Sequence, residues 1–131
     1  MPPIVEMSLR LVAAAVLGAA IGFQREKAKR PAGLRTNALI ALGAALFTIS
    51  GVFAFPDDQA RVAAGIVTGI GFLGAGAILH KDGGIVAGLT TAASIWTVAG
   101  IGMAVGAGQY VLALVTTALT IIILSLPHAF R

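Results

Sequence analysis

The chain has 131 residues, of which 58% are hydrophobic and 11% are charged, and its formal net charge is +4. A soluble domain carries about 25% charged residues, so this composition argues against a soluble domain and for a membrane protein with several spans. The absence of cysteine excludes disulfides, thiolate metal sites and cysteine nucleophiles. The positive charge lies beside apolar runs and not on a basic face with interleaved aromatic residues, which argues against nucleic-acid binding.

Five apolar runs have about the length that a helix needs to cross a bilayer. We expect spans at residues 4–23, 36–55, 62–79, 85–105 and 110–126. The first run reaches the required length only if Glu6 and Arg10 lie at the membrane interface. Its dense basic cluster follows the apolar run, which favours a retained helix over a cleaved signal peptide. The predicted fold class is therefore all-α, a single polytopic transmembrane helix bundle over residues 1–131.

The segment 24–35 sets the predicted topology, because it holds five of the nine Lys and Arg residues. Basic residues in short loops stay on the cytoplasmic side during insertion. We therefore expect the N-terminus outside and the C-terminus in the cytoplasm. This topology places seven basic residues inside and leaves only Arg10 and Arg61 outside.

An internal repeat is visible on comparing the two halves of the chain. Residues 33–40 align with residues 88–95, sharing Gly, Leu, Thr, Ala and Ile at matching places, and residues 10–13 align more loosely with 61–64. The pattern predicts a tandem parallel repeat of two helical hairpins, with chance similarity among Gly-rich and Ala-rich helices as the alternative. Two Gly-Leu-x-Thr helix starts would then face the same side. Their free amides would suit an anion, or a carboxylate such as Glu26.

Glycine spacing predicts where helices touch. Three pairs of glycines lie four residues apart, and this spacing lets helix backbones approach closely in lipid. The pairs are Gly18 and Gly22, Gly65 and Gly69, and Gly102 and Gly106. Some of these faces are expected to serve a homo-oligomer. The glycine-rich run at 69–74 lacks the preceding strand and the acidic residue of a dinucleotide fingerprint, so we expect no nucleotide site there.

Few residues could carry chemistry. No nucleophile, base and orienting acid can be assembled from them, so we expect no enzyme. Magnesium prefers hard oxygen ligands, and Glu26 is a weak candidate ligand, helped only by Asn37, Thr90, Thr91, Ser94 and backbone carbonyls. The alternative for Glu26 is an ion pair with Arg30, four residues on. His80 and His128 have no second ligand nearby and are interpreted as solvated loop residues.

Three motifs, at residues 30–39 (RPAGLRTNAL), 69–76 (GIGFLGAG) and 88–96 (GLTTAASIW), resemble in order and spacing the membrane domain of the MgtC/SapB family. The resemblance covers about residues 9–126. It implies a bacterial inner-membrane protein of about five spans, linked to growth at low magnesium and, in some pathogens, to virulence through survival inside host phagocytes. Family members are described as magnesium transporters or as regulators that bind the F-type ATP synthase.

Longer members continue into a soluble cytoplasmic domain, so we expect regulation through such a domain to be absent here or supplied by another chain. The family often has Glu where Gln24 stands and Gln where Gly65 stands, and both differences remove a candidate cation ligand. The functional candidates that match the family pattern are Arg25, Glu26, Arg30, Arg35, Thr36, Asn37, Thr90, Thr91 and Trp96.

These patterns predict a non-enzymatic regulator of a membrane partner, acting in magnesium homeostasis or in adaptation to low magnesium. Its basic segment and two helix starts would dock a partner or an anionic group. The alternative is a transporter of magnesium or another ion, with Glu26, Thr90 and Thr91 at its cytoplasmic mouth. A purely structural membrane subunit is a third interpretation. The expected partners are the lipid bilayer, further copies of the chain and a membrane protein such as the F-type ATP synthase. We expect no resident cofactor, with Mg²⁺ acting only as a substrate or effector.

Overall fold

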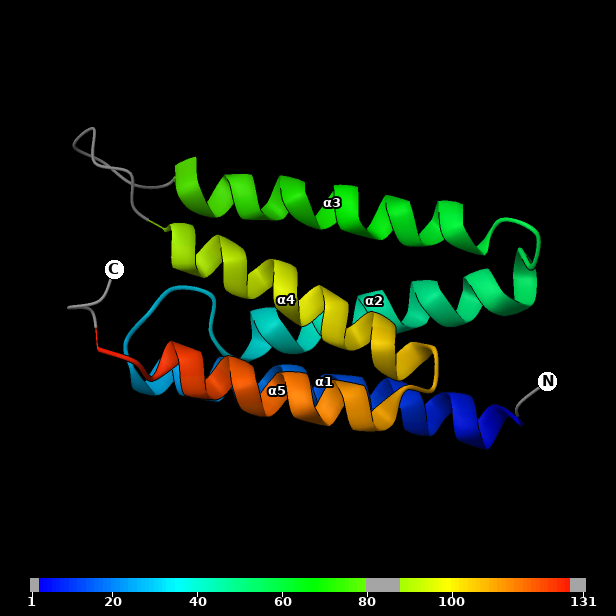
Figure 1. Cartoon of the computed structure of the whole chain (residues 1–131), viewed down its shortest axis with the longest axis horizontal. Coiled ribbons are helices and arrows are strands. Elements are labelled where there is room, and N and C mark those ends of the chain that lie inside the picture. The colour runs from blue at the N-terminus through cyan, green and yellow to red at the C-terminus, as the bar shows by residue number, and fades with distance from the viewer. Residues whose placement is uncertain (1–2, 80–87, 128–131) are drawn as a thin grey trace.

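The computed structural model describes residues 3–79 and 88–127, and this part of the chain folds into five α-helices (Figure 1). They are α1 (Ile4–Lys27), α2 (Leu34–Ala54), α3 (Gln59–Leu79), α4 (Leu89–Gly106) and α5 (Tyr110–Leu124). The first four helices are long and apolar enough to cross a membrane, and α5 is a shorter apolar helix of 15 residues. The predicted all-α helical bundle is confirmed.

Successive helices run in opposite directions, so the hairpins α1–α2 and α3–α4 point the same way (Figure 1). The helix starts that the sequence comparison aligned occupy corresponding places, because Gly33 is the N-cap of α2 and Gly88 is the N-cap of α4. We call the end of the bundle where α2 and α4 begin the loop end. The looser match of residues 10–13 with 61–64 does not follow the packing, in which Gly18 contacts Asn37 and Gly74 contacts Ala92.

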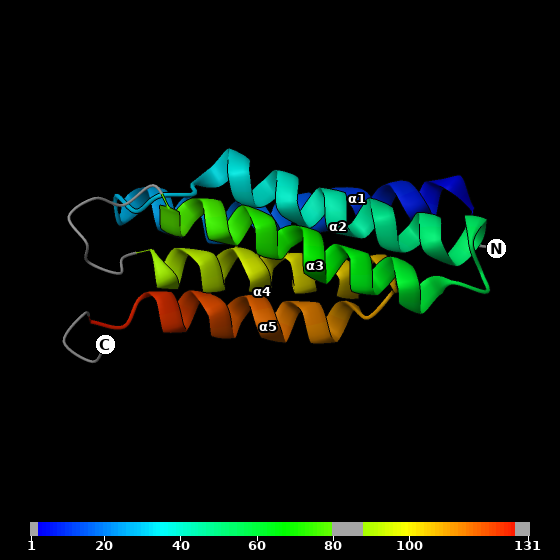
Figure 2. The ribbon, with the colours of Figure 1, turned by 90° about the horizontal axis from the view of Figure 1, so that it is seen from above.

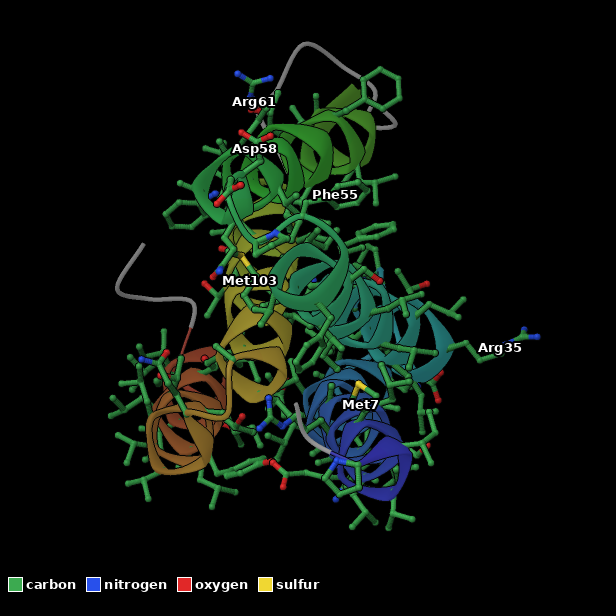
Figure 3. The ribbon with its side chains drawn as sticks, turned by 90° about the vertical axis from the view of Figure 1, so that its right-hand side faces the viewer. Met7, Arg35, Phe55, Asp58, Arg61 and Met103 are labelled. Atoms are coloured by element: carbon green, nitrogen blue, oxygen red, sulfur yellow. The ribbon has the colours of Figure 1, made fainter. Side chains whose placement is uncertain are left out.

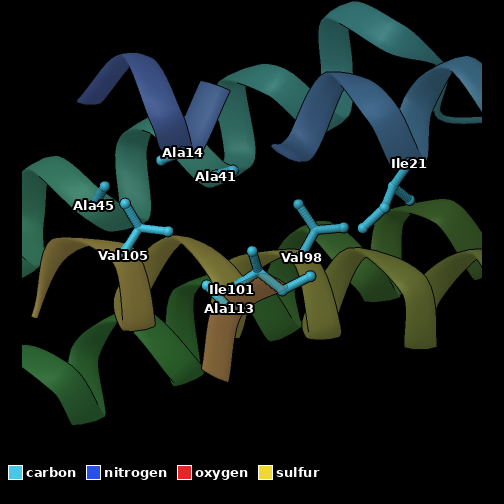
Figure 4. Close-up of a cluster of buried hydrophobic side chains, with 8 residues drawn as sticks. All are labelled: Ala14, Ile21, Ala41, Ala45, Val98, Ile101, Val105 and Ala113. Atoms are coloured by element: carbon cyan, nitrogen blue, oxygen red, sulfur yellow. The ribbon is translucent and has the colours of Figure 1, made fainter. Parts of the chain in front are cut away.

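Helix α4 lies at the centre of the bundle and contacts each of the other four helices (Figure 2). Its apolar residues are spread around the helix and not confined to one side, as expected for a helix surrounded by others. Helix α3 contacts only α2 and α4 within the described chain, and it lies at one edge of the bundle when viewed along the helices (Figure 3). The main core joins α1, α2, α4 and α5 (Figure 4) through Ala14, Ile21, Ala41, Ala45, Val98, Ile101, Val105 and Ala113.

Two of the three glycine pairs lie where helices cross. A Cβ at Gly18 would overlap the Asn37 carbonyl oxygen of α2, and a Cβ at Gly22 would come within 2.5 Å of the Gly33 carbonyl oxygen. Helix α4 approaches α2 in the same way, because a Cβ at Gly102 would overlap the carbonyl oxygen of Ala41. When two helix backbones come this close, the van der Waals attraction between them increases, and this attraction drives helix association in lipid.

The third pair makes no such contact within the chain. A Cβ at Gly65 or Gly69 of α3 would meet no atom within 4 Å. Both residues instead line a groove of about 500 Å³ between α2 and α3, together with apolar side chains of both helices. The described chain therefore uses Gly18, Gly22, Gly102 and Gly106 for internal packing and leaves this pair uncovered.

The helix boundaries differ from the expected spans in one way that affects the candidate site. Helix α1 continues to Lys27, four residues beyond the expected end of the span, so residues 24–27 form its last turn instead of a loop. Helix α5 ends at Leu124, before the expected residue 126. The expected start of the fourth span at residues 85–87, and both histidines, lie outside the described residues.

At the opposite end of the bundle, Arg10 joins three elements. Its guanidinium pairs with Glu6, one helical turn earlier, at 2.5 Å. It also donates to the Gly106 carbonyl oxygen at 2.9 Å and to the Tyr110 hydroxyl at 3.0 Å. Arg10 therefore satisfies a carbonyl at the C-terminus of α4 and ties the turn before α5 to α1.

The close crossing of α4 over α2 predicts different effects for two chemically identical substitutions. Gly102→Ala should lower the free energy of unfolding by about 1–3 kcal/mol, because its methyl group has no space beside the Ala41 carbonyl. Gly69→Ala, which faces open space, should leave stability unchanged or raise it by up to about 1 kcal/mol through helix propensity. Unfolding of the purified protein by dodecyl sulfate in mixed micelles measures both. Equal effects of the two variants would contradict the packing described here.

Candidate functional site

Most of the residues that the sequence singled out lie at the loop end, where α1 and α5 end and α2 and α4 begin (Figure 1). Residues 28–33 connect α1 to α2, and we call them the 28–33 loop. Its backbone carbonyls point toward side chains of the two helices that it joins.

Arg25 is almost completely buried, with 3% of its surface exposed. Its Nε and Nη2 atoms donate to the Pro31 carbonyl oxygen at 3.2 and 3.1 Å, and Nη2 also donates to the Thr91 hydroxyl. Among the described residues, no carboxylate lies within 4.0 Å of this guanidinium. Arg25 thus ties the last turn of α1 to the 28–33 loop and to the first turn of α4.

Asn37 is fully buried and holds the other side of the loop. Its Nδ2 atom donates to the carbonyl oxygens of Ala32 at 2.7 Å and Gly33 at 2.9 Å. Its Oδ1 atom is buried and accepts no hydrogen bond from the described residues. An unsatisfied buried acceptor costs free energy, which the two hydrogen bonds that Nδ2 donates offset in part.

Glu26 caps α2. Its Oε1 atom accepts a hydrogen bond from the Leu34 backbone N–H at 3.0 Å, at the first residue of that helix. The alternative ion pair with Arg30 is not formed, although both residues are described. The carboxylate instead satisfies a free amide at the positive end of the helix dipole, as the sequence allowed.

The 28–33 loop has a backbone conformation that needs this support. Lys29 and Ala32 both have positive φ angles, 57° and 59°, in the left-handed region that non-glycine residues seldom adopt. Such residues cost about 1–3 kcal/mol each and persist only where surrounding contacts determine them. Here the contacts come from Arg25, Glu26 and Asn37. The loop is therefore held in one shape by groups beneath it.

Four basic side chains around the loop are exposed: Lys27, Lys29, Arg30 and Arg35. Lys27 extends over the ring of Phe23, with its ammonium 5.6 Å from the ring centroid. Arg35, in the first turn of α2, projects sideways from the bundle (Figure 3). Among the described residues, the loop end thus has one buried cation that supports the backbone and four cations that face outward.

The other predicted residues lie apart from this cluster or at its rim. Thr36 and Thr90 are exposed in the first turns of α2 and α4, and neither contacts Glu26 by a hydrogen bond within the described chain. Trp96 is exposed on α4 and lines a separate groove of about 330 Å³ between α3, α4 and α5. The structure therefore brings together Arg25, Glu26, Asn37 and Thr91, but not Trp96.

Sequence reasoning missed the backbone carbonyls of the loop and the role of Gln24. Gln24 donates through Nε2 to the Leu124 carbonyl oxygen at 3.4 Å, a long contact that reaches the end of α5. Its Oε1 atom is buried without a hydrogen-bond partner among the described residues. No local sequence signal marks the contacts of Gln24 and Arg25 with α5 and α4, because each joins residues distant in the chain.

The arrangement suits an anion better than a metal cation. The described residues contain no group of three His, Asp or Glu side chains that could hold a metal ion. The Glu26 carboxylate already accepts a backbone hydrogen bond, and the Arg25 guanidinium contacts the Thr91 hydroxyl that the transporter interpretation would use. A fixed positive charge at this position repels Mg²⁺, and the repulsion is strongest where water is excluded.

Four spanning helices of suitable length and composition, in an all-helical bundle, fit a multi-pass α-helical membrane protein. Within this class the chain belongs to the MgtC family, because the model of that family matches residues 11–131. The resemblance read from the three sequence motifs is confirmed.

Several curated relatives are similar to this chain. Protein MgtC of Salmonella typhimurium (strain LT2) is 55% identical over 109 residues, which are 83% of this chain and 47% of that protein. The "Putative magnesium transporter YhiD" of Escherichia coli (strain K12) is 44% identical over 132 residues, covering 94% of this chain and 61% of that protein. The chain thus spans about half the length of the curated relatives it matches. No solved structure matches it.

Two neighbouring threonines offer a matched test of the buried cluster. Thr91→Val should lower the free energy of unfolding by about 1–3 kcal/mol, because it removes the hydroxyl that accepts from the charged, buried Arg25. Thr90→Val makes the same change at an exposed position and should shift stability by less than about 0.5 kcal/mol. The same unfolding assay measures both, and a Thr91→Val variant as stable as the parent would rule out this support.

Proposed function

We propose that this protein is a non-enzymatic regulator of magnesium-related physiology in the bacterial inner membrane, and that it docks a membrane partner at its loop end. The name of one relative, the "Putative magnesium transporter YhiD" of Escherichia coli, supports the link to magnesium. The observation that carries the docking role is the 28–33 loop, because buried side chains hold it in one shape while its cations face outward.

A preformed basic loop is suited to protein recognition. Its shape is fixed before binding, so docking costs less conformational entropy than ordering a mobile segment. Lys29 and Arg30 lie on the loop itself and are exposed, so they would meet acidic side chains of the partner. The F-type ATP synthase, which the family resemblance implies, is the first partner to test.

The proposal includes a homo-oligomer, for which Gly65 and Gly69 offer a face that no described residue covers.

The proposed orientation follows from the distribution of basic residues. The loop end carries most of the described positive charge and would face the cytoplasm, with the N-terminus outside. The odd number of described helices brings the end of α5 to the loop end in this arrangement. Docking at this end therefore requires a partner with a cytoplasmic acidic surface.

The rival function is ion transport, and the name of YhiD favours it. Transport would need Glu26, Thr90 and Thr91 to line the cytoplasmic mouth of a pathway. The position of Arg25 argues against this pathway, because its buried charge contacts Thr91 directly. A cation that took the Pro31 and Thr91 oxygens as ligands would leave the buried Arg25 guanidinium without its hydrogen-bond acceptors, which costs several kcal/mol.

Charge reversal on the loop tests docking. The double variant Lys29→Glu/Arg30→Glu should reduce co-purification of the F-type ATP synthase by at least about tenfold, because like charges facing each other across an interface cost several kcal/mol. Arg61→Glu, an exposed reversal on α3 near the other end of the bundle, should have no such effect. Growth at low magnesium should fall in parallel with co-purification. Unchanged co-purification and growth in the loop variant would refute docking through this loop.

Flux measurements test the rival directly. In liposomes that contain a magnesium-sensitive dye, the purified protein should admit no more Mg²⁺ than empty vesicles do. Saturable entry that is lost in Glu26→Gln would instead establish a transporter. Because Glu26 caps α2, the variant must first be shown to retain its helicity and its unfolding midpoint.

A further inference from the structure

We propose that the loop end also binds anionic phospholipids, whose headgroup phosphates contact Lys27 of α1 and Arg35 of α2. This site lies at the same end of the bundle as the proposed docking loop but uses different cations. It therefore does not depend on the regulatory function being correct. The proposal rests on where each of the two cations lies relative to the lipid-facing surface of its own helix.

Lys27 lies one helical turn beyond a side chain that faces lipid. Phe23 is 55% exposed on α1, a helix whose outer surface is apolar. The Lys27 ammonium lies over this ring, 5.6 Å from its centroid. The lysine side chain is therefore on the outer, lipid-facing side of α1 and not on the side that packs against the other helices. Because α1 runs toward the loop end, the ammonium is placed where the apolar surface stops.

Arg35 has the same relation to α2. Leu39, one turn further into the span, is 65% exposed at the edge of the groove between α2 and α3, so the described chain does not cover this side of α2. Viewed along the helices, Arg35 projects sideways and away from the other helices (Figure 3). A side chain that projects in this direction at the end of a span lies in the headgroup layer instead of reaching into the cytoplasm.

Neither cation is neutralised within the described chain. No described carboxylate lies within 4.0 Å of Lys27 or Arg35. The nearest acid in sequence, Glu26, is occupied by the Leu34 N–H. A guanidinium can donate two parallel hydrogen bonds to a phosphate, and an ammonium contributes a point charge. Two such cations at the end of the lipid-facing surface therefore favour a phosphate-bearing headgroup with a net negative charge over a zwitterionic one.

The same loop provides a control pair. Lys29 and Arg30 carry the same charges but lie on the turn between the helices, beyond the end of α1 and its lipid-facing surface. They would face the cytoplasm and the proposed protein partner. The two pairs carry equal charge, so they differ only in position. Lys27 and Arg35 lie beside the lipid-facing surface, and Lys29 and Arg30 lie on the turn that would meet the protein partner.

The experiment uses fluorescence quenching by brominated lipids. Phe23→Trp in a Trp96→Phe background places the only tryptophan beside Lys27, and the full chain is reconstituted in vesicles of phosphatidylcholine with increasing phosphatidylglycerol. Brominated phosphatidylglycerol should quench the introduced tryptophan as if it bound about fivefold or more tightly than brominated phosphatidylcholine. Adding Lys27→Gln/Arg35→Gln should bring the two lipids close to equal, whereas Lys29→Gln/Arg30→Gln should leave the preference intact.

Equal quenching by both lipids in the reporter protein would overturn the proposal. Equal loss of preference in the two double variants would also overturn it, because it would reflect total loop charge. Circular dichroism and the unfolding midpoint confirm that each variant is folded. The co-purification assay on the same two double variants separates the lipid site from the partner site. If only Lys29→Gln/Arg30→Gln loses the partner, docking does not involve Lys27 and Arg35, and the quenching result alone decides whether these two residues bind lipid.

Discussion

The loop end depends on one buried guanidinium. Removing a charge from water costs several kcal/mol unless fixed polar groups replace the solvent. For Arg25 those groups are the Pro31 carbonyl and the Thr91 hydroxyl, which belong to two elements far apart in the chain. If either element moved out of hydrogen-bond distance, a charged donor would be left unsatisfied. The 28–33 loop and the start of α4 are therefore positioned together, and the close crossing of α4 over α2 at Gly102 keeps them there.

The five basic residues of segment 24–35 fall into two groups, the buried Arg25 and four exposed cations, which sequence composition cannot separate. The hydrophobic runs were sufficient to predict the helices and the bundle, because burial in lipid requires every backbone group to be bonded within its helix. They were not sufficient to place Arg25, which was grouped with Lys27 and Arg30 as a loop cation. Its burial depends on acceptors at Pro31 and Thr91 that are set by tertiary structure. A charged residue after an apolar run marks the end of that run, but not the end of the helix.

Glycine spacing had the same limit. The sequence predicted that glycines four residues apart allow close packing, and the pairs at 18/22 and 102/106 do approach α2 and the loop before it at backbone distance. The pair at 65/69 has identical spacing and faces a groove instead. Glycines four residues apart make a helix surface on which a second helix can pack closely. Whether the same chain provides that second helix depends on the tertiary fold. The carboxylate at the start of α2 was easier to foresee, because Glu26 is close to Leu34 in sequence and a helix N-terminus attracts negative charge.

The two hairpins share a backbone plan but differ in chemistry, and this difference bears on mechanism. Where Gly18 of the first hairpin meets Asn37, Gly74 of the second meets Ala92, so the amide that holds the first loop has no counterpart at the matching place. A pathway between two equivalent halves would be lined by polar groups from both. In the described residues, the first hairpin supplies Arg25, Glu26 and Asn37, and the second supplies Thr91 as a hydrogen-bond acceptor. The hydrogen bonds of these described polar groups therefore hold the 28–33 loop in one shape, which agrees with the docking role proposed above.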